Sequence, residues 1–223
     1  MRRVTSKEFI QWDVVNWSRA LTFWRMPQSK SCECLELGAR KGGLSLWLAL
    51  GGHRVVCSDL QSPIDKATPL HRAFGADGSI RYEAIDARHI PYRDHFDIVI
   101  FKSLLGGVSR EDHTLQQAVI DEIYKCLKPG GTLLFAENLA ASNLHRAARR
   151  QFVTWGSRWD YLKLTDVQQL LKAYRRVDIR AAGFAGAFGQ KEWQRQLLGS
   201  VDRWLDWMIP PTWRYIVFGA AQK

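Results

Sequence analysis

Hydrophobic and polar positions along the chain follow two kinds of pattern. Apolar residues that recur every three or four positions predict helices, whereas alternating or continuous short apolar runs predict strands. The predicted strands cover residues 32–37, 53–59, 79–86, 96–103, 132–137, 175–182 and 214–223. The predicted helices cover residues 8–25, 42–52, 63–74, 112–127, 142–153, 165–174 and 190–209.

Strands and helices alternate up to residue 137, which is typical of β-α-β units and a parallel sheet. Beyond that point the pattern loosens, and two late strands flank a long helix. We therefore expect an α/β fold, a Rossmann-like three-layer sandwich. Its seven-stranded sheet would be mostly parallel, with an antiparallel C-terminal edge strand and an extra N-terminal helix.

The length of 223 residues and a hydrophobic content of 46% suit one domain with a sizeable core. Within it, residues 1–30 are expected to form an N-terminal helical cap. Residues 31–137 would form a cofactor-binding core, and residues 138–223 the substrate-side helices and C-terminal strands.

The helix predicted over residues 190–209 carries a long apolar stripe. Its members are Trp193, Leu197, Val201, Trp204 and Met208. We expect this stripe to be buried by packing over the sheet. Trp207, Pro210, Pro211 and Trp213 fall elsewhere, and two further interpretations remain open for them, a membrane interface or the roof of a substrate pocket.

The turn between the first strand and the next helix, "LELGARKGG", points to a ligand site. Gly38 permits close approach of the backbone to a ligand, and Gly42 opens a helix whose first amides are free. Asp59 ends the following strand, where a carboxylate can accept both hydroxyls of a ribose. Because ligands of open parallel sheets bind at the carboxyl ends of strands, this pattern predicts an adenosine-containing ligand.

Arg40 separates two classes of such ligand. A dinucleotide fingerprint needs a middle glycine so that the pyrophosphate can approach the backbone, and Arg40 stands at that position. An NAD-linked oxidoreductase is therefore disfavoured. S-Adenosylmethionine contains adenosine without a pyrophosphate and fits better.

Four stretches in order resemble the class I S-adenosylmethionine-dependent methyltransferases. They are "LELGARKGG", "CSDL", "EAIDARHIPY" and the pair "FDIVIF" and "LKPGGTLLFAE". The resemblance covers about residues 32–137. It implies S-adenosylmethionine as cofactor and S-adenosylhomocysteine as product.

The resemblance also implies roles for individual residues in holding the cofactor. Gly38 and Ala39 would lie against the methionine part, and Glu36 would contact its amino group. Asp59 would hold the ribose and Leu60 would pack on the adenine. The full set of expected cofactor-binding residues is Glu36, Gly38, Ala39, Arg40, Gly42, Asp59, Leu60, Asp86 and Ala87.

Methyl transfer is an in-line displacement, so alignment and exclusion of water supply most of the catalysis. A hydroxyl acceptor also needs a base. The candidate catalytic residues are Glu137, Lys102 and His89, with His113 and His145 as further histidines. The expected substrate-binding residues are Gly106, Gly107, Asn138, Arg146, Arg150 and Trp17.

The distribution of charge along the chain narrows the chemical class of the methyl acceptor. The chain carries a net charge of +10, and residues 138–223, with 14 Lys and Arg against 6 Asp and Glu, hold +8 of it. We expect a small or medium anionic acceptor such as a sugar, a glycan or a lipid-linked intermediate from glycan biosynthesis. An RNA or DNA methyltransferase is an alternative, although no Pro-Cys or Pro-Pro-Tyr motif supports it. A non-catalytic binding protein with this fold is another.

The remaining sequence features concern location and metals. Four cysteines without a paired motif favour free thiols in the cytoplasm. We expect no secretory signal and no transmembrane segment, and peripheral contact with the inner face of a membrane stays open. No metal-ligand spacing is present. The oligomeric state is not predicted.

Overall fold

The computed structural model describes residues 5–25, 31–108, 114–145, 147 and 161–223. Seven strands of these residues form one sheet, in the order β3-β2-β1-β4-β5-β7-β6. They are β1 (Glu33–Leu37), β2 (Arg54–Asp59), β3 (Ile80–Ala84), β4 (Phe96–Lys102), β5 (Leu127–Asn138), β6 (Arg176–Ala182) and β7 (Ile216–Gln222). All neighbours pair in parallel except that β7 runs antiparallel to both β5 and β6. The expected Rossmann-like sheet is confirmed, with β7 inserted beside the edge strand β6.

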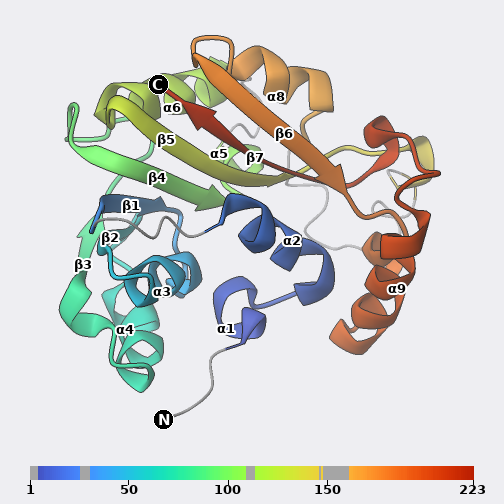
Figure 1. Cartoon of the computed structure of the whole chain (residues 1–223), viewed down its shortest axis with the longest axis horizontal. Coiled ribbons are helices and arrows are strands. Elements are labelled where there is room, and N and C mark those ends of the chain that lie inside the picture. The colour runs from blue at the N-terminus through green and yellow to red at the C-terminus, as the bar shows by residue number, and fades with distance from the viewer. Residues whose placement is uncertain (1–4, 26–30, 109–113, 146, 148–160) are drawn as a thin grey trace.

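Helices cover both faces of this sheet (Figure 1). One face carries α1 (Ser6–Ile10), α2 (Val14–Trp24), α3 (Gly43–Leu50) and α4 (Ile64–Ala73); the other carries α5 (Leu105–Val108), α6 (Thr114–Cys126) and α8 (Leu164–Leu170). Successive strand residues alternate between two apolar clusters, with Leu35 in one and Cys34 in the other. Helices therefore cover both faces of the strands. In such sheets ligands bind at the carboxyl ends of the strands, so a ligand site is expected there.

The helical segment expected over residues 8–25 is broken into two helices, an alternative that its pattern left open. Gln11 and Asp13 adopt positive φ angles of 75° and 46°, which a right-handed helix cannot contain. Asp13 is buried, and its carboxylate accepts a hydrogen bond from the Tyr215 hydroxyl at 2.5 Å. The break thus anchors the N-terminal helices to β7.

The C-terminal helix α9 (Glu192–Leu205) overturns the expected burial of its apolar stripe. Trp193 is 62% exposed and Trp204 is 81% exposed, whereas the buried residues of this helix are Gly199 and Asp202. The helix packs on α2 and on the turn Ala185–Phe188 rather than over the sheet. Of the helix expected over residues 142–153, residues 143–145 and 147 are helical, Ser142 is not, and the rest lie outside the described residues.

Candidate functional site

The turn after β1 has the backbone of a glycine-rich loop. Gly38 has a φ of 65°, and a Cβ atom there would lie 3.1 Å from Leu104 Cδ1. Arg40 has a φ of 53°, so it adopts the left-handed conformation that glycine adopts readily and a side chain disfavours. The loop therefore keeps its path although an arginine stands in it.

Gly42 ends this turn against α4. Its φ is 68°, and a Cβ atom would lie 2.5 Å from His71 Nε2. The same ring nitrogen lies 2.8 Å from the Gly42 carbonyl oxygen, and Nδ1 lies 2.8 Å from the Tyr82 hydroxyl. Gly42 is thus required for close packing of α3 on α4, which fixes the direction in which α3 leaves the loop.

Asp59 lies beside this loop, at the end of β2. Its carboxylate accepts hydrogen bonds from the backbone N–H of Arg40 at 2.9 Å and from its neighbour Leu60 at 2.8 Å. The Ala39 N–H donates to the Ser58 carbonyl at 2.9 Å, which ties the loop to the strand. The Asp59 carboxylate is therefore oriented before any ligand arrives, and its other lone pairs are free to accept hydroxyl groups.

A cavity of about 370 Å³ opens at the carboxyl ends of β1, β2 and β4 and in the loop after β3. This volume is within the usual range for a small-molecule site. It is lined by Gly38, Arg40, Asp59, Leu60, Ile85, Asp86, Ala87, Arg88, Ser103, Leu104, Gly107 and Val108. Most of the expected cofactor-binding residues therefore share one cavity. The exceptions are Glu36, Ala39 and Gly42, which lie within two residues of the lining residues Gly38 and Arg40 in the sequence.

Arg88 holds the Asp86 carboxylate at the far wall. Its Nε lies 2.9 Å from Asp86 Oδ1, and its Nη2 lies 2.6 Å from Asp86 Oδ2. These hydrogen bonds lower the pKa of Asp86 below its ordinary value. The carboxylate is thus kept ionised and oriented by a residue that the sequence interpretation did not select.

Glu36 turns away from the cavity toward the start of α3. One of its carboxylate oxygens accepts both the backbone N–H of Ser45 at 2.7 Å and the Ser45 hydroxyl at 2.5 Å. Burial raises the pKa of Glu36 to about 7. The Glu36 side chain therefore links β1 to the first turn of α3. It does not line the cavity, where it was expected to contact a ligand.

Glu137 is completely buried at the end of β5. Its Oε2 accepts hydrogen bonds from the backbone N–H groups of Leu104 and Leu105, both at 2.8 Å, and its Oε1 accepts one from Asn138 N–H at 2.9 Å. Burial raises the pKa of Glu137 to about 7, against these bonds. The side chain therefore holds the segment after β4, which forms one wall of the cavity.

Lys102, at the end of β4, lies under two tryptophans of the N-terminal segment. Its Nζ lies 4.7 Å from the ring centroid of Trp17 and 5.2 Å from that of Trp12. Burial and the nearby Arg40 guanidinium lower the pKa of Lys102 to about 8, although the rings and the surrounding carboxylates favour the ammonium form. An amine of this kind can hold or release a proton near neutral pH.

The other predicted site residues are distributed as follows. Gly107 lines the cavity, Gly106 is buried in α5, and the Asn138 Nδ2 donates to the Ser103 hydroxyl at 3.0 Å. His89 is exposed and does not line the cavity. His145 is buried, with its ring nitrogens on the Ser142 hydroxyl and the Phe184 carbonyl. Arg146, Arg150 and His113 lie outside the described residues.

Some site residues escaped the sequence interpretation. Ser103 and Leu104 follow β4 directly, and the φ of 56° at Ser103 marks a sharp turn into the cavity wall. Their position after a buried strand was the available signal. The contact of Trp12 with Lys102 spans most of the first half of the chain, so no local pattern could reveal it.

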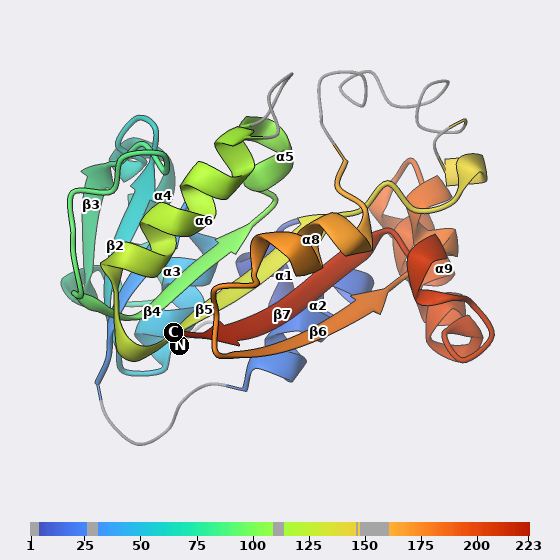
Figure 2. The same cartoon turned by 90° about the horizontal axis from the view of Figure 1, so that it is seen from above.

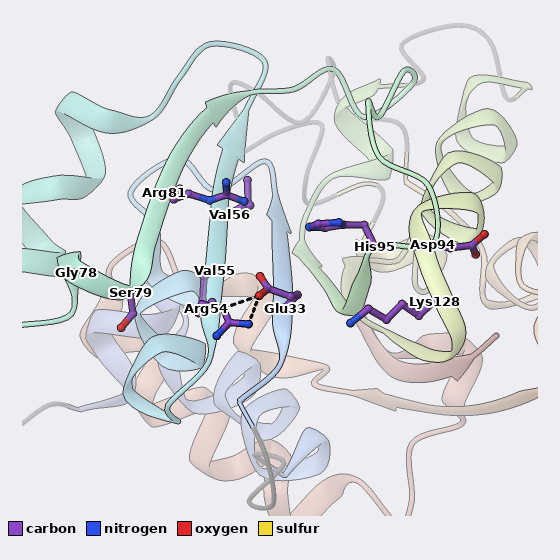
Figure 3. Close-up of a pocket in the computed structure, with 10 residues that line it drawn as sticks. All are labelled: Glu33, Arg54, Val55, Val56, Gly78, Ser79, Arg81, Asp94, His95 and Lys128. Carbon is purple, nitrogen blue, oxygen red and sulfur yellow. Dashed lines mark hydrogen bonds and ion pairs between the residues drawn. The ribbon is translucent and has the colours of Figure 1, made fainter.

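A second cavity, of about 570 Å³, lies at the opposite ends of the strands (Figure 3). Arg54 at the start of β2 forms an ion pair there with Glu33 at the start of β1. His95 and Lys128 border it from the other side. Because ligands of open parallel sheets bind at the carboxyl ends of strands, the site described above remains the first candidate.

The described residues offer neither a metal site nor a membrane-spanning helix. They contain no group of three or more His, Cys, Asp or Glu side chains that could hold a metal ion. Within the same ranges, every helix is too short or too polar to cross a bilayer.

Comparisons with known proteins agree with this geometry. Residues 35–135 match the family model of a methyltransferase domain. A search of curated proteins gave no match.

Among solved structures, phosphoethanolamine N-methyltransferase 2 of Haemonchus contortus, in complex with phosphomonomethylethanolamine and S-adenosylhomocysteine, is 18% identical with a TM-score of 0.63. The match covers 93% of this chain and 52% of that one, so this chain spans about half its length. A methyltransferase of Methanosarcina mazei is 18% identical with a TM-score of 0.63, covering 87% and 93% of the two chains.

The 1,6-didemethyltoxoflavin N1-methyltransferase of Burkholderia thailandensis, with its toxoflavin precursor and S-adenosylhomocysteine bound, is 15% identical with a TM-score of 0.57. That match covers 98% of this chain and 79% of the other. At such identities the structural likeness shows the fold alone.

Proposed function

We propose that the chain, whose residues 35–135 match the family model of a methyltransferase domain, is a class I methyltransferase that transfers the methyl group of S-adenosylmethionine to a small anionic acceptor. One observation carries this proposal. The loop after β1, the oriented Asp59 carboxylate and the loop after β3 share a single cavity at the carboxyl ends of the strands. Two of the solved methyltransferases were crystallised with S-adenosylhomocysteine, which supports the same cofactor here.

The cofactor supplies an electrophilic methyl group on a sulfonium, and the chain supplies its position. Gly38 leaves room for the methionine part, because any Cβ atom there would approach Leu104. Asp59 accepts the two ribose hydroxyls through lone pairs that Arg40 and Leu60 do not use. The exposed Leu60 side chain packs on the adenine.

The adenine edge meets Asp86 and Ala87. Arg88 orients the Asp86 carboxylate through its ion pair, so the adenine amino group must share that carboxylate with Arg88. We assign Glu36 and Gly42 to the support of α3 beneath the methionine part, where their contacts with Ser45 and His71 keep the loop in place.

Lys102 is our candidate for the group that accepts a proton from the acceptor. It ends β4 next to the cavity-lining Ser103, although its own side chain is not among those that line the cavity, and the rings of Trp12 and Trp17 lie over its amine. Glu137, also a candidate catalytic residue from the sequence, is better suited to position the segment after β4, because three backbone N–H groups donate to its carboxylate. The methyl-transfer rate should therefore rise with pH through about 8, as the Lys102 ammonium loses its proton.

An anionic acceptor fits the positive charge at this edge. Arg40 lines the cavity, and the Haemonchus enzyme was crystallised with a phosphorylated amine. A sugar, glycan or lipid-linked phosphate is the acceptor class that we propose. The net charge of +10 keeps an RNA acceptor as the second candidate. RNA binding would weaken steeply with added salt, whereas binding of a small acceptor would not.

The four free cysteines support a reducing compartment, and we propose the cytoplasm. Three of them are buried in the described core, so their role there is packing.

Calorimetry with S-adenosylhomocysteine on Asp59→Ala tests the cofactor site. The loss of two charge-assisted hydrogen bonds should weaken binding by about 2–3 kcal/mol, or roughly 30- to 150-fold. Asp178→Ala is the matched control, because Asp178 is an exposed carboxylate on the edge strand β6. Equal affinity in the wild type and Asp59→Ala would reject the assignment.

Lys102→Met tests the proton acceptor. Cofactor affinity should change by less than about threefold, whereas the rate of S-adenosylhomocysteine formation should fall by about a hundredfold or more and lose its rise through pH 8. A rate that keeps the wild-type pH profile in this variant would exclude Lys102 as the base.

A further inference from the structure

Helix α9 turns its polar side toward the body of the protein and its apolar side toward solvent, the reverse of the usual arrangement. The side toward the body carries Gly199, which lies against Val15 and Asn16 of α2, and Asp202, which is 1% exposed. Gly199 has no room for a side chain, because a Cβ atom would lie 3.0 Å from the Val15 Cβ. A small residue and a carboxylate therefore fill the side of the helix that a core normally fills with apolar residues.

The opposite side of α9 is apolar and faces solvent. We call Trp193, Leu197, Val201, Trp204 and Met208 the α9 stripe. Spacings of three and four residues place the first four in one row along the helix, and Met208 lies in the turn that follows Leu205. Their exposed fractions run from 42% for Val201 to 81% for Trp204, and Trp207 next to the row is 84% exposed. A row of this kind on a folded domain marks an interaction surface.

The acidic residues of this segment are all engaged on the inner side. Glu192 accepts the backbone N–H groups of Asp13 and Val14, at 2.7 and 3.0 Å. Asp202 accepts the Asn16 amide at 2.8 Å, and Asp206 pairs with Arg19. No carboxylate of α9 is therefore left to oppose an anionic partner.

The charges that remain beside the α9 stripe are positive. Lys191 and Arg203 are exposed, and neither makes an ion pair with a described residue in this structure. They belong to the third of the chain that carries a net +8, from 14 basic and 6 acidic residues. The exposed cations at the N-cap of α9 and in its last turn thus flank the row that carries the tryptophans. This composition is typical of helices that lie in the headgroup region of an anionic bilayer.

We propose that the α9 stripe docks the protein on the surface of an anionic membrane. The tryptophans would enter the interface, where an amphipathic indole is favoured, and Lys191 and Arg203 would pair with lipid phosphates. A second copy of the chain is a poorer partner, because two such faces would bring like charges together. In this arrangement the helix lies in the plane of the interface.

The position of α9 suits this orientation. It lies at one end of the molecule, away from β2 and β3, in both views (Figure 1, Figure 2). It packs on α2, whose Trp17 covers Lys102 at the end of β4. Docking through the α9 stripe is a property of this surface alone and does not depend on the proposed methyl transfer.

Sedimentation with vesicles tests the proposal. Wild-type protein should bind vesicles that contain phosphatidylglycerol, bind pure phosphatidylcholine vesicles far less, and shift its tryptophan emission to the blue. In Trp204→Ser with Trp207→Ser, partitioning should fall by at least about tenfold. Lys191→Gln with Arg203→Gln should lower it by about fivefold for each charge.

Leu50→Ser is the control, because Leu50 is an exposed apolar residue of α3 in the other half of the molecule, with an exposed fraction of 43%, close to that of Val201 in the stripe. It should bind vesicles as the wild type does. Calorimetry with S-adenosylhomocysteine on the tryptophan variant separates the two proposals, since cofactor affinity should be unchanged.

Three results would overturn the assignment. The first is equal vesicle binding by the wild type and the tryptophan variant, and the second is no vesicle binding by the wild type. The third is a dimer in light scattering that the tryptophan variant abolishes, which would assign the α9 stripe to a second copy of the chain.

Discussion

The cofactor-side half of the molecule and its C-terminal helix use amphipathic sequence in opposite ways. In β1 to β4 and α3, apolar residues lie inside, and residues such as Leu35 and Leu46 are fully buried between the sheet and its helices. In α9, equally regular apolar residues such as Leu197 lie outside, with 62% of Leu197 exposed. A periodic pattern shows that a helix has an apolar face and a polar face. Which of the two faces packs against the rest of the domain depends on the residues of the polar face.

The polar face of α9 contained that information. Gly199 and Asp202 lie together on one side, and such residues fit where two helices approach closely and where backbone N–H groups need an acceptor. In α3 no comparable polar side competes, because six of its eight residues are buried.

The largest effect should come from closing the cofactor cavity. Gly38→Val places a branched side chain at a φ of 65° and against Leu104, so affinity for S-adenosylhomocysteine should fall at least about a hundredfold by calorimetry. Gly52→Val is the control, because Gly52 has a φ of 86° in open space. It shares the backbone strain but should retain binding. Normal binding by Gly38→Val would mean that the loop has been misassigned.

Removal of the inner carboxylate of α9 should be the next largest effect. In Asp202→Ala, the Asn16 amide and the backbone N–H groups of Ala185 and Gly186 lose their acceptor. Chemical denaturation should show a loss of about 3 kcal/mol in the free energy of unfolding. A loss below about 1 kcal/mol would show that α9 is not held through this side.

Relief of backbone strain at Arg40 should give a smaller change of opposite sign. Arg40→Gly removes a side chain from a φ of 53°, which should raise the free energy of unfolding by about 0.5 kcal/mol after the entropy cost of glycine. Arg81→Gly, in the strand β3, should instead lower it, since no strain is present there. Destabilisation by both variants would indicate that the Arg40 side chain stabilises the loop.

The smallest effect should follow substitution in the α9 stripe. Leu197→Ser should change the free energy of unfolding by less than about 0.5 kcal/mol, because most of the side chain is already in water. The same substitution at the buried Leu46 of α3 should cost several kcal/mol, roughly 3 or more. A large loss at Leu197 would contradict the exposed position of the stripe.

The sequence alone predicted the sheet and most of the residues that line the cavity at the carboxyl ends of its strands. Gly38, Asp59 and Asp86 each follow a strand, and parallel strands bring such positions to one edge whatever their distance in the chain. Local pattern and strand order therefore suffice for these residues.

Other contacts could not be predicted in this way. Glu137 binds Leu104 through its buried carboxylate, and Lys102 lies under Trp12, because of side-chain packing across the sheet and the break between α1 and α2. That break depends on positive φ angles at Gln11 and Asp13, residue types that carry no strong signal for it.

Side-by-side calorimetric titration of the wild-type protein with S-adenosylmethionine, S-adenosylhomocysteine and NADH tests the central claim most directly. The oriented Asp59 carboxylate and the loop with Arg40 in place of the middle glycine predict micromolar binding of the first two ligands and none of NADH. Binding of NADH, or no heat from either adenosylated amino acid, would contradict the assignment of this cavity to a methyl donor.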